Sequence, residues 1–354
     1  MLKRFRERFT TTDFFMWLIG GSIVTLVVVG SIATLSQGTY TIRHWFDFLV
    51  FGLAQGSVYA LIALGYTLVY GILRMINFAH SEVFMSGAYI GFFFATAMKK
   101  SGFLDGNPLL ALLIIFAVAM TISVVIAVLL ERVAYRPLRK APRLVPLITA
   151  IGASFFLQET FRTLFGSASK AYPDMNALKG TFALGGPFII QKIQVLVIVA
   201  AALMMLALYL YVMRTKTGKA MRAVSEDKDT ASLMGIDVDA IIVRTFVLGA
   251  AAAGAGGVLY CLMFRQINAY MGFVPSIKAF TAAVLGGIGN LPGAMLGSLF
   301  LGLFESIGPI LFLDGLGVPA PYQLKDVIAF TMLVLVLIFR PTGILGERLA
   351  TTKA

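Results

Sequence analysis

Long apolar runs recur along the chain and restrict its fold more than any other feature. Most are close to the ~20 residues that an α-helix needs to cross roughly 30 Å of hydrocarbon. Only 13% of the residues are charged, whereas soluble domains carry about 25%, and a β-barrel would show alternating segments of about ten residues. We therefore predict an all-α polytopic membrane protein with about ten transmembrane helices. The runs lie near residues 14–35, 45–72, 76–98, 108–130, 144–165, 190–213, 241–264, 272–291, 293–313 and 324–340.

The Lys and Arg residues predict the orientation of these helices. Most of the 29 fall at the two termini, at 132–143 and at 214–244, and loops rich in these residues stay in the cytoplasm. We therefore expect both termini in the cytoplasm, which requires an even number of crossings. The run 272–291 is the weakest, because it contains Pro275 and Lys278. We predict an irregular crossing there, since a fully re-entrant segment would place the basic C-terminus outside.

The same pattern predicts the domain organisation. Residues 1–40 hold a basic head and an apolar run that is longer than the 7–15 residues typical of a signal peptide, so we expect an uncleaved first transmembrane helix. Residues 41–346 form the main transmembrane domain, with a cytoplasmic loop at 214–240. Residues 347–354 form a cytoplasmic tail. No connecting segment is large enough to be a separate folded domain.

The positions of the basic residues, which give a net charge of +12, and the single cysteine argue against two classes of site. A basic surface can bind nucleic acid, but these basic residues lie in loops and form no stripe with interleaved aromatics. Membrane topology accounts for them, and we expect no nucleic-acid partner. Cys261 leaves no internal disulfide and no cysteine-based zinc site, and we expect it to pack as a small hydrophobic side chain in a helix.

The stretch 218–240 is charged although its surroundings are apolar. Asp227 would interrupt the apolar face of a single helix, so we predict two short helices, with residues 225–229 supplying the break and the N-cap and Gly235 ending the second helix. Such an element presents a small apolar ridge with a charged rim, which suits the docking of a soluble partner. The apolar face that a single helix would present lies within about 100° and consists of Ala220, Ala223, Val224, Ala231 and Met234. The alternative to a docking element is an ordinary solvated loop.

Polar residues inside or beside the apolar runs are candidates for a substrate pathway. Gln55, Tyr59 and Tyr66 lie within about 60° of one another on a helix, although a packing face is the alternative. Asn77 and His80 lie between two runs, and polar groups at membrane depth are costly and usually functional. These two would cost little at the membrane interface, and with only two histidines in the chain we expect no metal site.

Glu305 is the last pathway candidate. It lies near the end of an apolar run without a basic residue close in sequence, so we expect an internal polar contact or a pathway role.

Nucleotide-binding and catalytic motifs are missing from the sequence. The Gly-rich segments 249–257 and 286–293 lack the Gly-x-x-x-x-Gly-Lys spacing of a Walker A loop. There is also no HExxH motif and no nucleophile elbow with usable triad partners, so we predict neither an enzyme nor a bound cofactor. Gly249 and Ala253 have the small-x-x-x-small spacing that permits close helix packing.

Six long motifs occur in order between about residues 47 and 346: GSVYALIALGYTLVYGILRMINFAHSEVF, ERVAYRPLR, LITAIGASFFLQE, GKAMRAVSEDKDTASLMGID, FTAAVLGGIGNLPGAMLGSLFLGLFES and DVIAFTMLVLVLIFRPTGILGE. In these motifs the chain resembles the membrane permease subunits of bacterial ATP-binding cassette (ABC) importers for branched-chain amino acids, of LivH type. It departs from the family at Ser81, where glycine is usual, and residues 1–40 are longer than usual.

The resemblance implies a permease in the bacterial inner membrane that moves branched-chain or related amino acids and has no ATPase of its own. It implies two ABC ATPase subunits, a second permease subunit in a heterodimer or a homodimer, and a periplasmic substrate-binding protein. A loop matching Gly218–Gly235 would fit a groove on the ATPase subunit. The coupling residues expected from this match are Gly218, Ala223, Glu226, Asp227, Ala231, Met234 and Gly235.

Two further functions stay open at this point. The same family could carry urea, short amides or other amino acids, because the binding protein selects the cargo. Alternatively, the chain could be an ion-coupled secondary transporter, for which a discontinuous helix near 272–293 would be suitable.

Overall fold

The computed structural model describes residues 11–139, 141–142, 144–186, 188–339 and 342–346. Residues 1–10 of the basic head and residues 347–354 of the tail lie outside the described residues. We expect both segments in the cytoplasm.

All ten apolar runs are helical. Their bounds are α2 Thr11–Gln37, α3 Ile42–Leu73, α4 His80–Lys100, α6 Pro108–Leu129, α7 Leu144–Phe165, α8 Lys192–Arg214, α11 Val238–Phe264, α12 Phe273–Gly286, α13 Leu291–Leu313 and α14 Lys325–Phe339. Within the described ranges, eight of these helices are both long and apolar enough to span a membrane alone. The predicted all-α polytopic fold is confirmed.

Shorter elements connect the long helices. At the connections lie α5 Phe103–Gly106, the π-helix η1 Leu130–Tyr135, and the 3₁₀ helices η2 Arg136–Leu138, η3 Asn176–Leu178, η4 Asp314–Leu316 and η5 Pro321–Leu324. Two short helices, α9 Lys216–Glu226 and α10 Lys228–Leu233, follow α8. The sequence did not predict the four short strands, which are β1 Lys170–Ala171, β2 Thr181–Gly185, β3 Phe188–Gln191 and β4 Gln266–Ile267.

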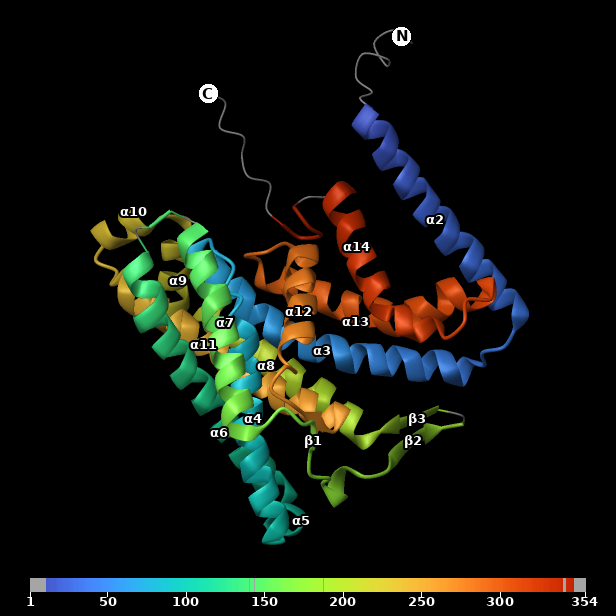
Figure 1. Ribbon diagram of the computed structural model, residues 1–354, viewed down its shortest axis with the longest axis horizontal. Helices are drawn as coiled ribbons and strands as arrows, with labels where there is room; N and C mark the ends of the chain where they lie inside the picture. Colours follow the sequence, from blue (N-terminus) through green and yellow to red (C-terminus); the bar gives the residue numbers. More distant parts are fainter. Residues whose placement is uncertain (1–10, 140, 143, 187, 340–341, 347–354) are drawn as a thin grey trace.

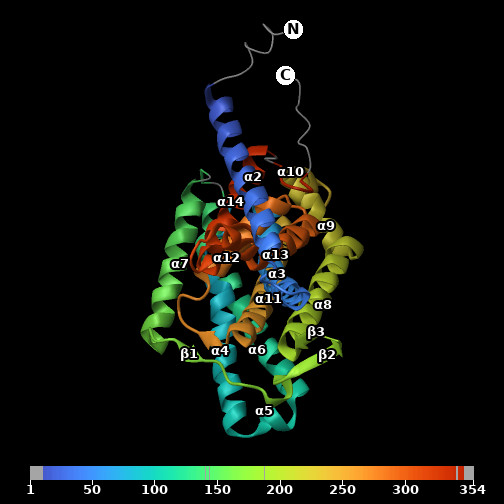
Figure 2. The same cartoon turned by 90° about the vertical axis from the view of Figure 1, so that its right-hand side faces the viewer.

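The strands form two antiparallel pairs at one end of the molecule. Lys170 of β1 pairs with Ile267 of β4, and Thr181 of β2 pairs with Gln191 of β3. We call this end the strand end, and the opposite end, which carries α9 and α10, the loop end. Figure 1 shows that α2 starts and α14 finishes on the same side of the molecule as α9 and α10. In Figure 2, α7 and α8 flank the central helices on opposite sides.

Helix α3 lies at the centre of the bundle, where small residues allow backbones to approach closely. A Cβ added at Gly52 would meet the Gly302 carbonyl oxygen of α13 at 2.9 Å, and one at Gly249 of α11 would meet the Gly65 Cα at 3.1 Å. Larger side chains would therefore separate these helices, which pack through van der Waals contact. The close packing predicted from the spacing at Gly249 is confirmed.

Helix α12 explains why the run 272–291 looked weak. Its 14 residues span about 21 Å, at 1.5 Å per residue, which is less than the roughly 30 Å of a hydrocarbon core. Gly272 lies against the Ser81 carbonyl inside the bundle, and the Gly286 carbonyl accepts a hydrogen bond from Leu345 N at 3.0 Å. The chain between β4 and Gly286 thus runs from the strand end to the loop end, with the helix covering the later part only.

Candidate functional site

Two short helices, α9 and α10, form the charged loop, as the sequence predicted. Asp227 separates them: its Oδ1 accepts hydrogen bonds from Asp229 N at 2.9 Å and Thr230 N at 3.1 Å, and its Oδ2 accepts one from Thr230 Oγ1 at 2.6 Å. These bonds, first of all the one from the Thr230 hydroxyl, lower the pKa of the Asp227 carboxyl. Asp227 is therefore the N-cap of α10.

Gly235 terminates α10 in the left-handed conformation, with a φ of 82°. Gly235 N donates to Ser232 O at 3.0 Å, and Ile236 N donates to Ala231 O at 3.1 Å, which is the hydrogen-bond pattern of a Schellman motif. The two caps fix both ends of a helix that has only six residues. A helix this short would not be stable without such contacts.

The sequence-derived coupling residues divide into a buried and an exposed group. Gly218 and Ala231 are buried, and a Cβ added at Gly218 would meet the Val212 carbonyl oxygen at 2.1 Å. These two residues therefore hold the loop against the bundle and offer no surface to a partner. The exposed members are Ala223, Glu226, Asp227, Met234 and Gly235.

The most exposed apolar surface of the loop lies at the end of α10. Leu233 is 88% exposed and Met234 is 78% exposed. Sequence reasoning missed Leu233, although its position beside Met234 could have indicated it. We call Leu233 and Met234 the α10 ridge. Two exposed charges lie on the same loop, Glu226 at the end of α9 and Asp229 in the first turn of α10.

Ionic contacts and hydrogen bonds attach the loop end to the membrane helices. Arg74, which caps α3 in the left-handed conformation with a φ of 54°, donates from Nη2 to Ser225 O at 3.0 Å. Asp239, at the start of α11, pairs with Arg136 at 2.5 Å and also with Arg139. Arg139 in turn pairs with the buried Glu131. A displacement of α9 and α10 would therefore act on α3, α11 and the segment after α6.

Three of the pathway candidates lie in one buried polar network. Gln55 Nε2 donates to the Tyr59 hydroxyl at 2.6 Å, and that hydroxyl donates to Glu305 Oε2 at 3.0 Å. Glu305 Oε1 contacts Lys278 Nζ at 2.5 Å, and the same Nζ lies 2.6 Å from Asp326 Oδ1. We call these five residues the charged network. It joins α3, α12, α13 and α14.

Lys278 is the member that sequence reasoning missed, because we took it only as a sign that the crossing at 272–291 is weak and irregular. Its side chain is 4% exposed and that of Glu305 is fully buried, whereas Asp326 is 46% exposed. A lysine at membrane depth is costly unless it is paired. That rule could have identified Lys278 as a partner for Glu305.

The other candidates lie in two separate contacts. The rings of Tyr66 and His80 are 4.8 Å apart between centroids, and Tyr135 donates to Asn77 Oδ1 at 2.6 Å. All four side chains are buried. The structure therefore does not unite the six predicted pathway residues in one site, but divides them among three.

Glu82 lies close to His80 in sequence but has its own partners. Its Oε1 accepts hydrogen bonds from Ser81 Oγ at 3.1 Å and from Ser154 Oγ at 3.2 Å. Across the part of the chain that the structure describes, no three His, Cys, Asp or Glu side chains could hold a metal ion.

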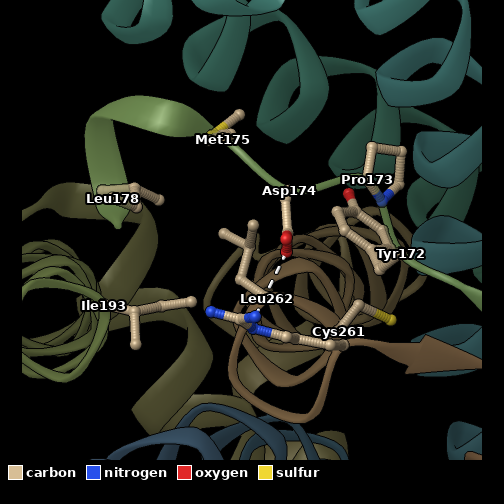
Figure 3. Close-up of a pocket in the computed structure, with 9 residues that line it drawn as sticks. Tyr172, Pro173, Asp174, Met175, Leu178, Ile193, Cys261 and Leu262 are labelled. Carbon is tan, nitrogen blue, oxygen red and sulfur yellow. Dashed lines mark ion pairs between the residues drawn. The ribbon is translucent and has the colours of Figure 1, made fainter. Parts of the chain in front are cut away.

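A small cavity lies at the strand end, where the segment after α7 crosses α11. Figure 3 shows Tyr172 and Met175 of this segment beside Cys261 and Leu262 of α11. Its volume is about 10 Å³, which is roughly the room for one water molecule. The cavity is therefore too small for an amino acid. Cys261 is buried in α11 as a free thiol, as the sequence predicted.

An apolar helix bundle with a buried charged network and an exposed two-helix loop defines a polytopic membrane transport protein. The family model described as branched-chain amino acid transport system, permease component, matches residues 48–337. The chain belongs to this permease family, and the predicted function as a transport permease is confirmed.

Curated relatives support the assignment. The chain is 48% identical over 310 residues to the high-affinity branched-chain amino acid transport system permease protein BraD of Pseudomonas aeruginosa, covering 86% of this chain and 97% of that protein. It is 44% identical to the corresponding protein LivH of Escherichia coli over 88% of this chain and 97% of LivH. A probable branched-chain amino acid transport permease protein LivM of Methanocaldococcus jannaschii is 28% identical over 38% of this chain and 41% of LivM. No solved structure matches the chain significantly.

Proposed function

We propose that this chain is a permease subunit of an ATP-driven importer of branched-chain amino acids, and that α9 and α10 transmit the motion of a separate ATPase subunit. The observation that carries the proposal is the α10 ridge, where two large apolar side chains are exposed on a short helix with fixed ends. Buried apolar anchors with a polar rim are typical of protein interfaces. In a loop without a partner, apolar side chains exposed to water would add no stability.

The partners follow from what the chain lacks and from its relatives. Its sequence has no Walker A motif, so ATP hydrolysis requires separate subunits, of which we propose two. The similarity to a LivM protein supports a second, related permease subunit, in a heterodimer in preference to a homodimer. A periplasmic binding protein would deliver the substrate.

The charge distribution supports one orientation in the bacterial inner membrane. Loops rich in Lys and Arg stay in the cytoplasm, and both the stretch 214–244 and the region after α6 lie at the loop end. We therefore propose that this end, with both termini, is cytoplasmic.

The charged network is our preferred position for substrate passage. An amino acid carries an ammonium and a carboxylate, and Glu305 and Lys278 present the complementary charges within 2.5 Å of each other. Tyr59 and Gln55 add a hydroxyl and an amide beside them. A passing amino acid would exchange its charges with this pair, so that neither charge remains in the membrane without a counter-charge. Tyr66, Asn77 and His80 would line the path toward the loop end.

Docking is tested by making the α10 ridge polar. We expect the double variant Leu233→Ser, Met234→Ser to lose co-purification of the ATPase subunits and to reduce ATP-driven leucine uptake into proteoliposomes at least tenfold. Val133→Ser is the matched control, since Val133 is an exposed apolar residue near the loop end but outside α9 and α10. Unchanged uptake in the double variant would refute the docking proposal, and uptake driven by an ion gradient without ATPase would favour a secondary transporter.

The pathway is tested by removing one hydroxyl. We expect Tyr59→Phe to raise the KM for leucine or lower its uptake about tenfold, because the bridge between Gln55 and Glu305 is lost. Tyr89→Phe is the control, since the Tyr89 hydroxyl is buried without a hydrogen-bond partner among the described residues. Equal effects of both substitutions would contradict the assignment. Competition of leucine uptake by urea, amides and other amino acids would identify the cargo.

A further inference from the structure

A basic cavity at the loop end has no role in the proposed transport cycle. Its volume is about 90 Å³, and three cationic side chains line it: Arg74, Arg139 and Lys228. They come from three separate segments, namely the C-cap of α3, the residue after η2, and the first residue of α10. The remaining lining residues are Leu73, Met75, Tyr135, Ala141 and Pro146.

The cations in this cavity are not balanced within it. No carboxylate is among its lining residues, and neither Arg74 nor Lys228 forms an ion pair with any residue that the structure describes. Arg139 pairs with Glu131 and Asp239, but its Nε is buried without an acceptor. Such an arrangement favours an anion with several acceptor oxygens.

The three charges also affect one another. The pKa of Lys228 is lowered, first by burial and then by the charges of Arg139 and Arg74. Like charges that are held together in this way are relieved by a bound anion. A phosphate group fits this requirement, because its oxygens can accept from Arg and Lys at the same time.

The surroundings of the cavity indicate where the phosphate comes from. Pro146 lies in the first turns of α7, and three neighbouring apolar side chains of this helix are exposed: Leu144, Val145 and Ile148. Tyr135, Leu73 and Met75 add apolar walls. A free phosphate would gain nothing from an adjoining apolar helix face, whereas acyl chains would cover it. Basic pockets between transmembrane helices on the cytoplasmic side bind anionic lipid headgroups.

We propose that this cavity binds the phosphate headgroup of an anionic phospholipid, whose acyl chains lie along the start of α7. The lipid holds the loop in place, because Arg74 also donates to Ser225 of α9 and Lys228 begins α10. The position of the coupling loop therefore depends on the lipid that surrounds the permease.

The experiment measures lipid retention on the full-length permease, alone and after addition of ATPase subunits, without ATP, so that its outcome does not depend on the proposed transport function. The permease is delipidated in detergent, titrated with phosphatidylglycerol or phosphatidylcholine, and examined by native mass spectrometry. We expect saturable binding of phosphatidylglycerol only. The double variant Arg74→Gln, Lys228→Gln should reduce it at least fivefold.

The control is Arg132→Gln, which removes one exposed positive charge at the same end of the molecule but outside the cavity. An equal loss in this variant would overturn the proposal, since it would indicate general attraction to a basic surface. Displacement of the lipid by millimolar inorganic phosphate would identify free phosphate as the ligand and would also overturn it. Loss of the lipid whenever ATPase subunits bind would overturn it as well, by assigning the cavity to an acidic side chain of that partner.

Discussion

Replacing Lys278 by methionine is a perturbation for which the structure predicts a large loss of stability. The Lys278 Nζ lies 2.5 Å from Glu305 and 2.6 Å from Asp326, so one substitution removes the counter-charge of two carboxylates. Asp326 is 46% exposed and can be solvated, but Glu305 is fully buried. Removing one partner of a buried ion pair costs about 3–5 kcal/mol, because the remaining charge has no compensation. We expect Lys278→Met to fall in this range.

Two further variants make this prediction specific. Asp326→Asn leaves the buried pair intact, and half-exposed pairs contribute about 0–1 kcal/mol, so we expect a loss of about 1 kcal/mol at most. The double variant Lys278→Met, Glu305→Gln leaves no buried charge, and the amide oxygen of the introduced glutamine would still accept from Tyr59. We therefore expect the double variant to be more stable than Lys278→Met alone.

The free energy of unfolding is measured for the purified permease by reversible denaturation in mixed detergent micelles, with circular dichroism as the signal. The reasoning is refuted if Lys278→Met costs no more than Asp326→Asn. It is also refuted if the losses from Lys278→Met and Glu305→Gln simply add in the double variant, since independent losses would mean that the two charges do not interact.

Three other changes have outcomes that the structure fixes. Gly302→Val would drive a side chain into the backbone of α3, which lies 2.4 Å from an added Cβ, whereas the Cβ of Gly71→Ala would meet nothing within 4 Å. We expect Gly302→Val to lower the free energy of unfolding by several kcal/mol in the same denaturation assay, and Gly71→Ala to leave it unchanged. Tyr135→Phe removes the donor to buried Asn77 and should cost about 1–3 kcal/mol. Asp227→Ala removes the cap of α10 and should speed hydrogen exchange there near neutral pH. Because the folded pKa of Asp227 is lowered, the cap is fully effective above the unfolded value of 3.8, and α10 should loosen in the native chain only as the pH falls through the lowered pKa.

The long helices and the two-helix loop were predictable because each depends on neighbours in sequence. The backbone of a long apolar run must form internal hydrogen bonds in a bilayer. The helices of the bundle could therefore be predicted from the runs alone. The caps of α10 were equally local, since Asp227 bonds to residues two and three positions later. The length of α12 could not be predicted in this way. It depends on a contact between residues far apart in the chain, since Gly272 packs on Ser81.

The charged network could be predicted only in part, for the same reason. The stripe of Gln55 and Tyr59 follows from helical periodicity, but Glu305 meets Lys278 across 27 residues of sequence. A lysine in a short apolar run is equally consistent with a loop at the interface, until the packing of α12 against α13 is known. The four strands are too short to leave a pattern in the sequence. In addition, β1 pairs with β4, so this pair forms only when the fold brings distant segments together.

The orientation of the bundle supplies a last prediction, which depends on the Lys and Arg bias and not on the fold. Cys261 is buried and is the only cysteine, so a Cys261→Ala background accepts single reporter cysteines. Ser167→Cys at the strand end and Ser232→Cys on α10 are both exposed positions, which makes them a matched pair for reaction with a membrane-impermeant maleimide. We expect labelling of the Ser167→Cys variant in intact spheroplasts, and of the Ser232→Cys variant only in inside-out vesicles.

The physical reason is that the region after α6 and the loop at 214–244 both carry dense positive charge at the same end, and moving either across the membrane is opposed. Labelling of the Ser232→Cys variant from outside would place the α10 ridge out of reach of any cytoplasmic ATPase. The docking proposal would then fail, even though the fold and the charged network would stand unchanged.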